Sequence, residues 1–343
     1  MTCESFSKQQ AANKPTVNEA DDEFGAEVTA GIPCVWWPAM GFGRDIQDSV
    51  VRAVTSLFEH GPTPLEHTLD HEGDPGLLGP DSISWQVLGD AAVFVGGIRA
   101  LVVQSAHPEV AAGVDDHSSY RNDPLGRLSR TSVYVTETTY GAMPEVDGAV
   151  AAVRRAHRPV IGNSERDLPY SASTPELAAW VHNVLTDSFL AAYQAFGPRP
   201  LSTDDADRFV AEQTKVGGLL RADPLPSTAR ELRDWIVDHP DRSVSLAQTN
   251  AIDFLKNPPL AIPVRVGYRL LFDAALTTIP EPLRMQLDVH PSRWADKTGR
   301  SSINAMRWAL GASPDWQLAL TRCNAPIPPD TFRQPLRSSP EPS

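Results

Sequence analysis

Two groups of polar residues in the middle of the chain have a spacing that could do chemistry. Arg127, Arg130 and Thr131 lie at positions i, i+3 and i+4, so they would share one face of a helix. Arg154 and His157, at i and i+3, would share a face of a second helix. Guanidinium and hydroxyl groups can bind an anion, and an imidazole can ligate a metal. The two faces could form opposite walls of one pocket, or they could be the solvated faces of two amphipathic helices.

Two short helices are needed to position these groups, and the sequence predicts both. Asp123 can cap the first helix, and Pro124 suits its first position because the backbone N–H there has no helical partner. The second helix is predicted over residues 149–157 (AVAAVRRAH). Only one helix length separates them along the chain.

Polar residues within apolar segments are the next candidates. Arg99 lies in the apolar segment VFVGGIRALVVQ. A buried charge without a partner destabilises a protein by about 5 kcal/mol, so Arg99 needs an anionic partner. Its partner could be a core carboxylate such as Asp90, or an anionic ligand such as a cofactor's propionate. His182, in WVHNVLTDSF, could be a core histidine bonded to a backbone carbonyl or a cofactor-binding residue.

A different metal site is also compatible with the sequence. His107 and Glu109 form a His-x-Glu pair at the start of a segment that reads as a loop after an apolar helix. With His117 or His182 they could make the two-histidine, one-carboxylate ligand set of a non-haem iron enzyme.

The rest of the chain predicts an all-α fold, without convincing alternating strands. One central domain over residues 31–323 is expected, between a disordered N-terminal tail (1–30) and a proline-rich C-terminal tail (324–343). Helices are predicted over Phe42–His60, Trp85–Ala106, Pro175–Phe196, Thr203–Leu220, Leu232–Val237, Pro259–Ile279 and Ser301–Leu310. There is no GxSxG elbow, Walker loop or strand-linked GxGxxG.

The composition limits the possible functions. A net charge of -13 argues against nucleic acid as a partner, because phosphate binding needs a basic surface. The three cysteines are scattered, so neither a disulfide framework nor covalent haem attachment is indicated. The polar, acidic N-terminus does not read as a secretory signal, and the longest apolar stretch is too short for stable membrane insertion. A cytoplasmic location is expected.

From Trp85 onward the sequence resembles the rubber-oxygenase (latex-clearing protein) and MpaB-type oxygenase family. The resemblance rests on GDAAVFVGGIRALVVQSAHPEVAAGVDDHSSYRNDPLGRLSRTSVYVTETTYG, AVRRAH and YSASTPELAAWVHNVLTDSFLAAY. It implies an all-helical fold that binds a non-covalent b-type haem through one histidine. It also implies a reaction with dioxygen, which in the best-known members cleaves carbon–carbon double bonds of isoprenoid chains.

The family's motifs fall on particular residues of this chain. Its proximal Arg-x-x-His pattern falls on Arg154 and His157, so the resemblance implies that His157 binds the haem iron. Its distal Arg-x-x-Lys-Thr pattern falls on Arg127, Arg130 and Thr131, with arginine in place of the lysine that can cap the iron. A guanidinium is a poor metal ligand, so Arg130 is better suited to bind a propionate, oxygen or substrate. Arg127 and Thr131 could hydrogen-bond dioxygen.

The resulting hypothesis is a haem b-dependent oxygenase that acts with dioxygen on a small apolar substrate, isoprenoid-like or a specialised metabolite. Arg99, Arg130 and Arg154 are available for the propionates. Tyr134 and Trp180 are candidate pocket walls. Two alternatives stay open: a haem-binding sensor or carrier without turnover, and the non-haem iron enzyme that uses His107 and Glu109.

Overall fold

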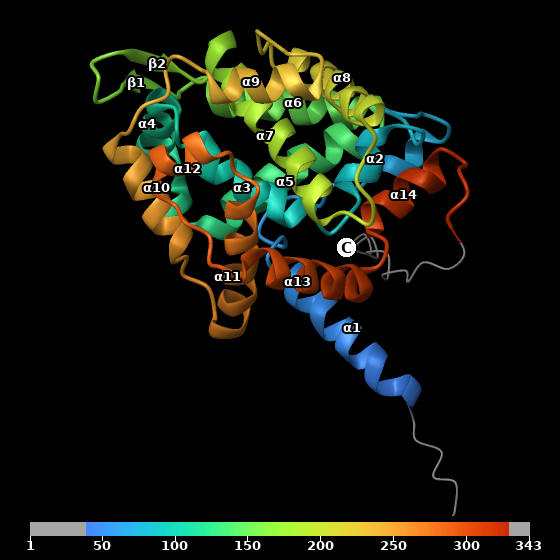
Figure 1. Ribbon diagram of the computed structural model, residues 1–343. Helices are drawn as coiled ribbons and strands as arrows, with labels where there is room; N and C mark the ends of the chain where they lie inside the picture. Colours follow the sequence, from blue (N-terminus) through green and yellow to red (C-terminus); the bar gives the residue numbers. More distant parts are fainter. Residues whose placement is uncertain (1–38, 329–343) are drawn as a thin grey trace, which may run out of the picture. The chain divides into compact units, whose positions relative to one another are not determined.

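The computed structural model describes residues 39–328, and nearly all of their regular structure is helical (Figure 1). The all-α prediction is therefore confirmed. The α-helices are α1 Ala39–Thr55, α2 Ile83–Leu88, α3 Val93–Gln104, α4 Pro108–His117, α5 Pro124–Tyr140, α6 Met143–His157, α7 Pro175–Phe196, α8 Thr203–Leu219, α9 Ala229–Val237, α10 Leu246–Lys256, α11 Ile262–Thr277, α12 Glu281–Leu287, α13 Ala295–Leu310 and α14 Pro314–Arg322. The described residues from Met40 onward belong to one compact unit.

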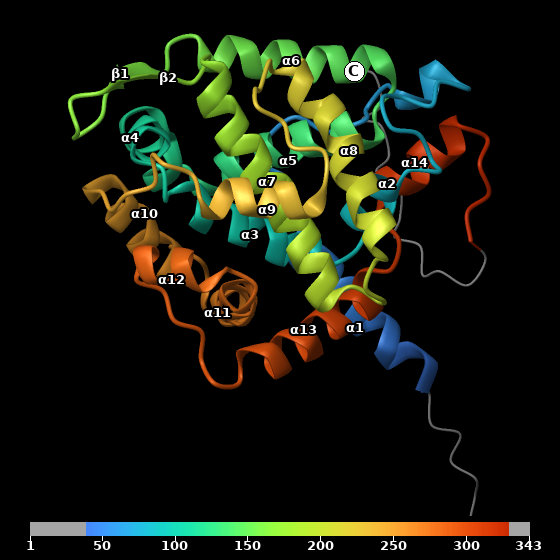
Figure 2. The same ribbon diagram turned by 45° about the horizontal axis from the view of Figure 1, so that its top comes forward.

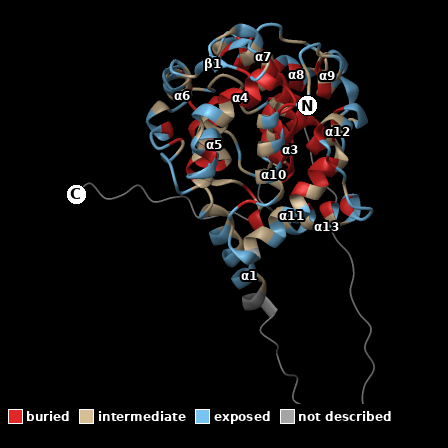
Figure 3. Cartoon of the chain, turned by 90° about the vertical axis from the view of Figure 1, so that its left-hand side faces the viewer, coloured by how far each residue is buried: buried red, intermediate tan, exposed pale blue. Residues whose placement is uncertain are grey.

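The core is built around α3 and α7, which are apolar on most sides because other helices surround them. Figure 3 shows the buried residues gathered on these inner helices, with exposed residues on the outer faces. At Gly96 the two backbones come close together. A Cβ atom there would lie 2.7 Å from Cδ1 of Phe189, so only glycine allows α3 and α7 this approach.

The apolar segment predicted as one helix, Trp85–Ala106, is in fact two helices, α2 and α3. The prediction of a single helix was wrong because Gly89 and Asp90 interrupt it. Oδ1 of Asp90 accepts a hydrogen bond from the backbone N–H of Ala92 at 2.9 Å, which gives the backbone a local alternative to the helical bond.

Two other features differ from the sequence prediction. Residues 108–117, expected to be a loop, form α4, which begins at Pro108. Two short strands, β1 (Ile161–Asn163) and β2 (Pro169–Ser171), pair antiparallel, with Gly162 opposite Tyr170. Strands of three residues are too short to show alternation in a sequence.

Side chains cap the starts of α8 and α9, whereas Thr174 before α7 makes no side-chain cap hydrogen bond. Ser202 accepts a hydrogen bond from the N–H of Asp205 before α8, and Thr228 accepts one from Glu231 before α9. The predicted N-terminal tail (1–30) and the end of the C-terminal tail (329–343) lie outside the described residues. The predicted limits of the central domain, 31–323, remain a prediction. None of the helices within residues 39–328 is long and apolar enough to cross a membrane.

Helices α5 and α6 follow one another closely and pack together (Figure 2). Only Gly141 and Ala142 separate them. The N–H of Ala142 donates to Oε2 of Glu145 at 2.9 Å, which fixes the start of α6. This tight connection places the two predicted polar faces on neighbouring helices.

Candidate active site

The start of α5 has the predicted cap, and Arg130 contributes to it. Oδ1 of Asp123 accepts a hydrogen bond from the N–H of Gly126 at 2.9 Å. The exposed Arg130 donates from Nη1 to Oδ2 of Asp123 and from Nη2 to Oγ of Ser119, both at 3.2 Å. Its guanidinium is therefore engaged in holding the first turn of α5, and a role for Arg130 toward a ligand remains a prediction.

Arg127 and Thr131 lie one turn apart on α5, and they differ in whether their side-chain donors are available to a ligand. The half-buried Arg127 guanidinium makes no hydrogen bond or ion pair within residues 39–328. Burial is the main cause of its lowered pKa, and Arg130 lowers it further. Oγ1 of the exposed Thr131 donates to the carbonyl of Arg127 at 3.0 Å. The Thr131 hydroxyl proton is thus used inside the helix, whereas the Arg127 guanidinium is free to bind a ligand.

Tyr134 carries a second unsatisfied group on α5, seven residues after Arg127. Its hydroxyl oxygen is buried and has no hydrogen-bond partner among the described residues. Burial raises the pKa of Tyr134, and the nearby positive charge of Arg154 on α6 acts in the opposite direction. A buried hydroxyl without a partner costs free energy unless a ligand or water supplies one. The Tyr134 hydroxyl is therefore available to a ligand or a water.

His157 and Arg154 end α6. The half-buried His157 ring makes no hydrogen bond within the described part of the chain, and burial lowers its pKa. Its imidazole is therefore neutral near pH 7, as a metal ligand must be. Nη2 of the exposed Arg154 donates to the carbonyl of Leu219 at 2.5 Å, which joins α6 to α8.

Arg99 is fully buried, and the carboxylate next to it is Asp187 of α7. The Nη2–Oδ2 distance is 2.6 Å, and Nη1 donates to Oγ of Ser188 at 2.7 Å. The predicted partner, Asp90, was wrong: it binds Arg307 instead, with an Nε–Oδ2 distance of 2.6 Å. The charge of Arg99 is already balanced, and a role toward a propionate remains a prediction.

His182 is buried in α7 in the way expected of a core histidine. It hydrogen-bonds the backbone carbonyl of Gln213, and Oγ1 of Thr186 lies 3.4 Å from its Nε2. Burial lowers its pKa to about 4. Gly217 of α8 lies against the ring, since a Cβ there would be 2.6 Å from Cδ2. The contacts of His182 are those of the α7–α8 packing, and a cofactor role remains a prediction.

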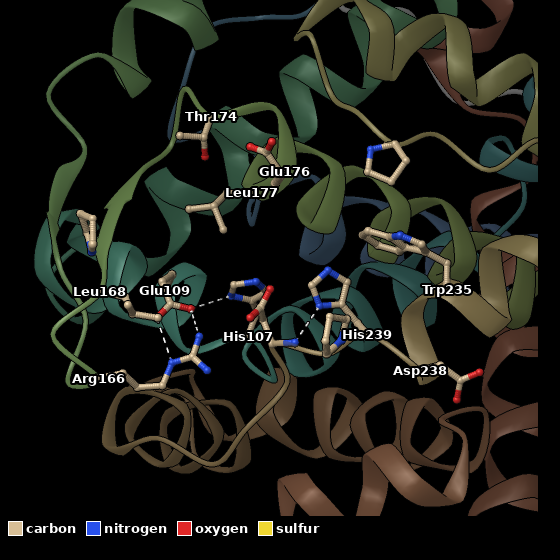
Figure 4. Close-up of a pocket in the computed structure, with 14 residues that line it drawn as sticks. His107, Glu109, Arg166, Leu168, Thr174, Glu176, Leu177, Trp235, Asp238 and His239 are labelled. Atoms are coloured by element: carbon tan, nitrogen blue, oxygen red, sulfur yellow. Dashed lines mark hydrogen bonds and ion pairs between the residues drawn. The ribbon is translucent and has the colours of Figure 1, made fainter.

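A pocket of about 650 Å³ lies elsewhere, beside the start of α4 and the loop after α9 (Figure 4). None of the residues predicted to bind haem lines it. In Figure 4 Glu109 lies between Arg166 and His107, and His239 lies on the other side of His107. Oε1 of Glu109 accepts from Nε of Arg166 at 3.1 Å, and Nδ1 of His107 lies 3.3 Å from Oε2. Glu109 is thus held by an arginine.

The non-haem ligand set predicted from the sequence does not come together. Nε2 of His117 lies 3.1 Å from the carbonyl of Ile161, and His182 is in the core. Among the described residues one group could hold a metal, and it consists of His107, His239 and Asp241. Their ligand atoms all lie within 4.8 Å of one another.

His239 and Asp241 were missed because they follow α9 in a loop, about 130 residues after His107. A signal was nevertheless present: the chain reads HPE at residues 107–109 and HPD at residues 239–241. Burial lowers the pKa of His107 to about 4, although the charge of Glu109 opposes this, and it also lowers the pKa of His239. Both rings are neutral near pH 7.

The comparisons with known proteins identify the family. Residues 85–312 match the family described as "ER-bound oxygenase mpaB/B'/Rubber oxygenase, catalytic domain". No curated protein and no solved structure matches the chain. The matched span is well over half of the 343 residues, and it contains the α5–α6 residues and the pocket beside α4. The chain therefore belongs to the mpaB/rubber oxygenase catalytic-domain family.

Proposed function

We propose that this protein is a haem b-dependent oxygenase in which His157 ligates the iron and Arg127 lies near the dioxygen site. The observation that carries the proposal is the set of unsatisfied polar groups on α5 and α6. Arg127 and His157 have no hydrogen-bond or ion-pair partner within residues 39–328, and the buried hydroxyl of Tyr134 has none either. Membership of an oxygenase family supports the same reaction class.

The residues present fit a haem. A neutral imidazole at His157 can ligate iron, and the exposed guanidinium of Arg154, which donates one hydrogen bond to Leu219, can also bind a propionate. When bound, haem b supplies a redox-active iron that activates dioxygen. Arg127 has five N–H donors, and partial burial makes them effective in stabilising negative charge. Tyr134 adds a donor on the same helix.

The proposed substrate is a small apolar molecule, isoprenoid-like or a specialised metabolite. Aliphatic side chains of α5, the helix that packs against α6, are available to form an apolar wall. Dioxygen is the proposed co-substrate, as in other members of an oxygenase family.

The iron ligand can be tested by reconstituting the full chain with haemin and recording its absorption spectrum. We expect a Soret band that shifts on reduction and on CO binding. In His157→Gly, haem retained after gel filtration should fall at least tenfold, equivalent to about 1.4 kcal/mol or more. Added imidazole should restore the spectrum, because it replaces the missing ring.

Arg155→Ala is the matched control, because Arg155 is an exposed residue two positions away on the same helix. It should bind haem as the wild type does. An unchanged haem spectrum in His157→Gly without imidazole would disprove the ligand assignment. A haem-binding sensor would give the same spectra, so turnover needs a separate assay. Dithionite-reduced protein should consume dioxygen in the presence of farnesol, used as an isoprenoid probe, and yield an oxygenated product.

A further inference from the structure

We propose that His107, His239 and Asp241 form a binding site for a divalent first-row transition-metal ion, such as Zn²⁺ or Fe²⁺. This site is separate from the proposed haem site, because it lies at the start of α4 and in the loop after α9. The candidate ligand atoms of the three residues lie within 4.8 Å of one another. In tetrahedral geometry, bonds of about 2.1 Å put two ligand atoms of one metal about 3.4 Å apart, so closure needs the ligand atoms to approach by up to about 1.4 Å.

The two histidines present lone pairs that a metal could use. Nδ1 of His239 accepts a long hydrogen bond, 3.3 Å, from the backbone N–H of Asp241, and a metal would replace this hydrogen bond at the Nδ1 lone pair. Nδ1 of His107 is buried and faces Oε2 of Glu109 at 3.3 Å, but the alignment is too poor for a hydrogen bond. A small rotation of the His107 ring would align Nδ1–H with Glu109 and leave the lone pair on Nε2.

Glu109 is positioned to act as the outer partner of a metal-bound histidine. Its carboxylate accepts hydrogen bonds from Oγ of Ser164 at 2.6 Å and from Nη2 of Arg166 at 2.5 Å. These bonds fix the carboxylate against His107. A carboxylate that accepts the second N–H of a histidine orients the ring and makes it a better ligand, and this arrangement is usual at protein metal sites.

The loop that carries His239 and Asp241 is attached directly beside His107. The backbone N–H of Ser243 donates to the carbonyl of Ala106 at 3.3 Å, and Nε2 of Gln286 donates to the same carbonyl at 2.8 Å. Nη1 of Arg242 donates to Oε1 of Gln286 at 2.9 Å. The side chains of His107, His239 and Asp241 are therefore brought together by hydrogen bonds of neighbouring residues.

Charge and surroundings favour a cation there. Glu109, Glu176, Asp238 and Asp241 line the pocket, with Arg166 as the basic residue among them. The rings of Trp180 and Trp235 lie 5.0 and 4.7 Å from the ring of His239, which limits the freedom of that side chain.

The ligand types determine the class of metal. Two imidazoles and a carboxylate suit Zn²⁺ or Fe²⁺, whereas Mg²⁺ and Ca²⁺ prefer sites made of oxygen ligands alone. Three protein ligands leave at least one coordination position open. That position would face the pocket of about 650 Å³, a size that admits a small molecule.

The test is a titration of the chelator-treated full-length protein with Co²⁺, followed by its visible absorption, and with Zn²⁺, followed by calorimetry. We expect one metal per chain. His239→Ala and Asp241→Asn should each weaken binding at least tenfold. Both residues lie in an exposed or half-buried loop, so these variants are suited to keep the fold. Asp238→Asn is the matched control: it is exposed in the same loop and pocket but outside the three-residue group, and it should bind metal as the wild type does.

The proposal is overturned if the wild type binds neither ion stoichiometrically, or if the His239→Ala and Asp241→Asn titrations match that of the wild type. His157→Gly should retain the Zn²⁺ site, and His239→Ala should retain haem. These two results separate the metal site from the proposed haem site, so that either proposal can fail without the other.

Discussion

Arg99 of α3 and Asp187 of α7 form an ion pair at the centre of the core, with an Nη2–Oδ2 distance of 2.6 Å and both side chains almost completely inaccessible to solvent. Ser188 accepts a further hydrogen bond from Nη1 of Arg99 at 2.7 Å. The pair joins the two central helices. It also explains how a charged residue is tolerated within the apolar sequence VFVGGIRALVVQ.

Breaking this pair on one side should destabilise the protein strongly. Asp187→Asn leaves the guanidinium of Arg99 buried without a counter-charge, and such changes cost about 3–5 kcal/mol. The free energy of unfolding, measured by urea denaturation, would show this loss. Asp296→Asn is the control, because Asp296 pairs with Arg300 on the surface, where such a pair contributes about 1 kcal/mol or less. Equal losses in the two variants would contradict the prediction.

Two adjacent glycines of α8 should respond in opposite ways to alanine. In Gly217→Ala the new methyl group would lie 2.6 Å from Cδ2 of His182 and 2.8 Å from Cδ2 of Leu225, so α7 and α8 must move apart. We expect a loss of about 1–3 kcal/mol. A Cβ added at Gly218 would meet no atom within 4 Å, and Gly218→Ala should stabilise the helix by up to about 1 kcal/mol. Thermal denaturation measures both effects: the melting temperature should fall in Gly217→Ala and should not fall in Gly218→Ala.

The buried His182 should make stability fall in mild acid. Its pKa is about 4 in the folded protein against an ordinary value of 6.5, so the unfolded chain takes up the proton first as the pH falls. The stability contribution is fully present above pH 6.5 and is lost progressively down to about pH 4. One such proton gives a slope of about 1.4 kcal/mol per pH unit.

Urea denaturation at several pH values between about 4 and 7 measures this slope for the wild type and for His182→Gln. The variant should show a shallower dependence, whatever its absolute stability. His290→Gln, at an exposed histidine, should keep the slope of the wild type. A slope that does not change in His182→Gln would mean that this ring does not contribute to the acid sensitivity.

Arg127 and Arg130 should differ in their effect on an anion bound at the proposed haem. The guanidinium of Arg127 has no partner within residues 39–328, whereas that of Arg130 is bonded to Asp123 and Ser119. In haemin-loaded protein, Arg127→Ala should weaken azide binding about tenfold, or about 1.4 kcal/mol. Arg130→Ala should change the azide dissociation constant by less than about threefold. The reverse order in a spectrophotometric titration would show that Arg130 is the residue near the iron.

Several features could be predicted from the sequence alone, because they depend on neighbouring residues. The start of α5 is one of them, because Asp123 supplies a side-chain acceptor and Pro124 has no backbone N–H to satisfy. The helical spacing of Arg154 and His157 follows from the helix repeat. The family could be identified from long ordered motifs, and the match over residues 85–312 confirms it.

Tertiary structure alone decided which charges pair and which side chains meet. The sequence showed that Arg99 needed an anion, but Asp90 and Asp187 were both available, and only the packing of α3 against α7 selects Asp187. It also could not show that His239 and Asp241 approach His107. That approach depends on a loop held to the carbonyl of Ala106, more than 130 residues earlier in the chain, and local sequence patterns carry no information about contacts at such a distance.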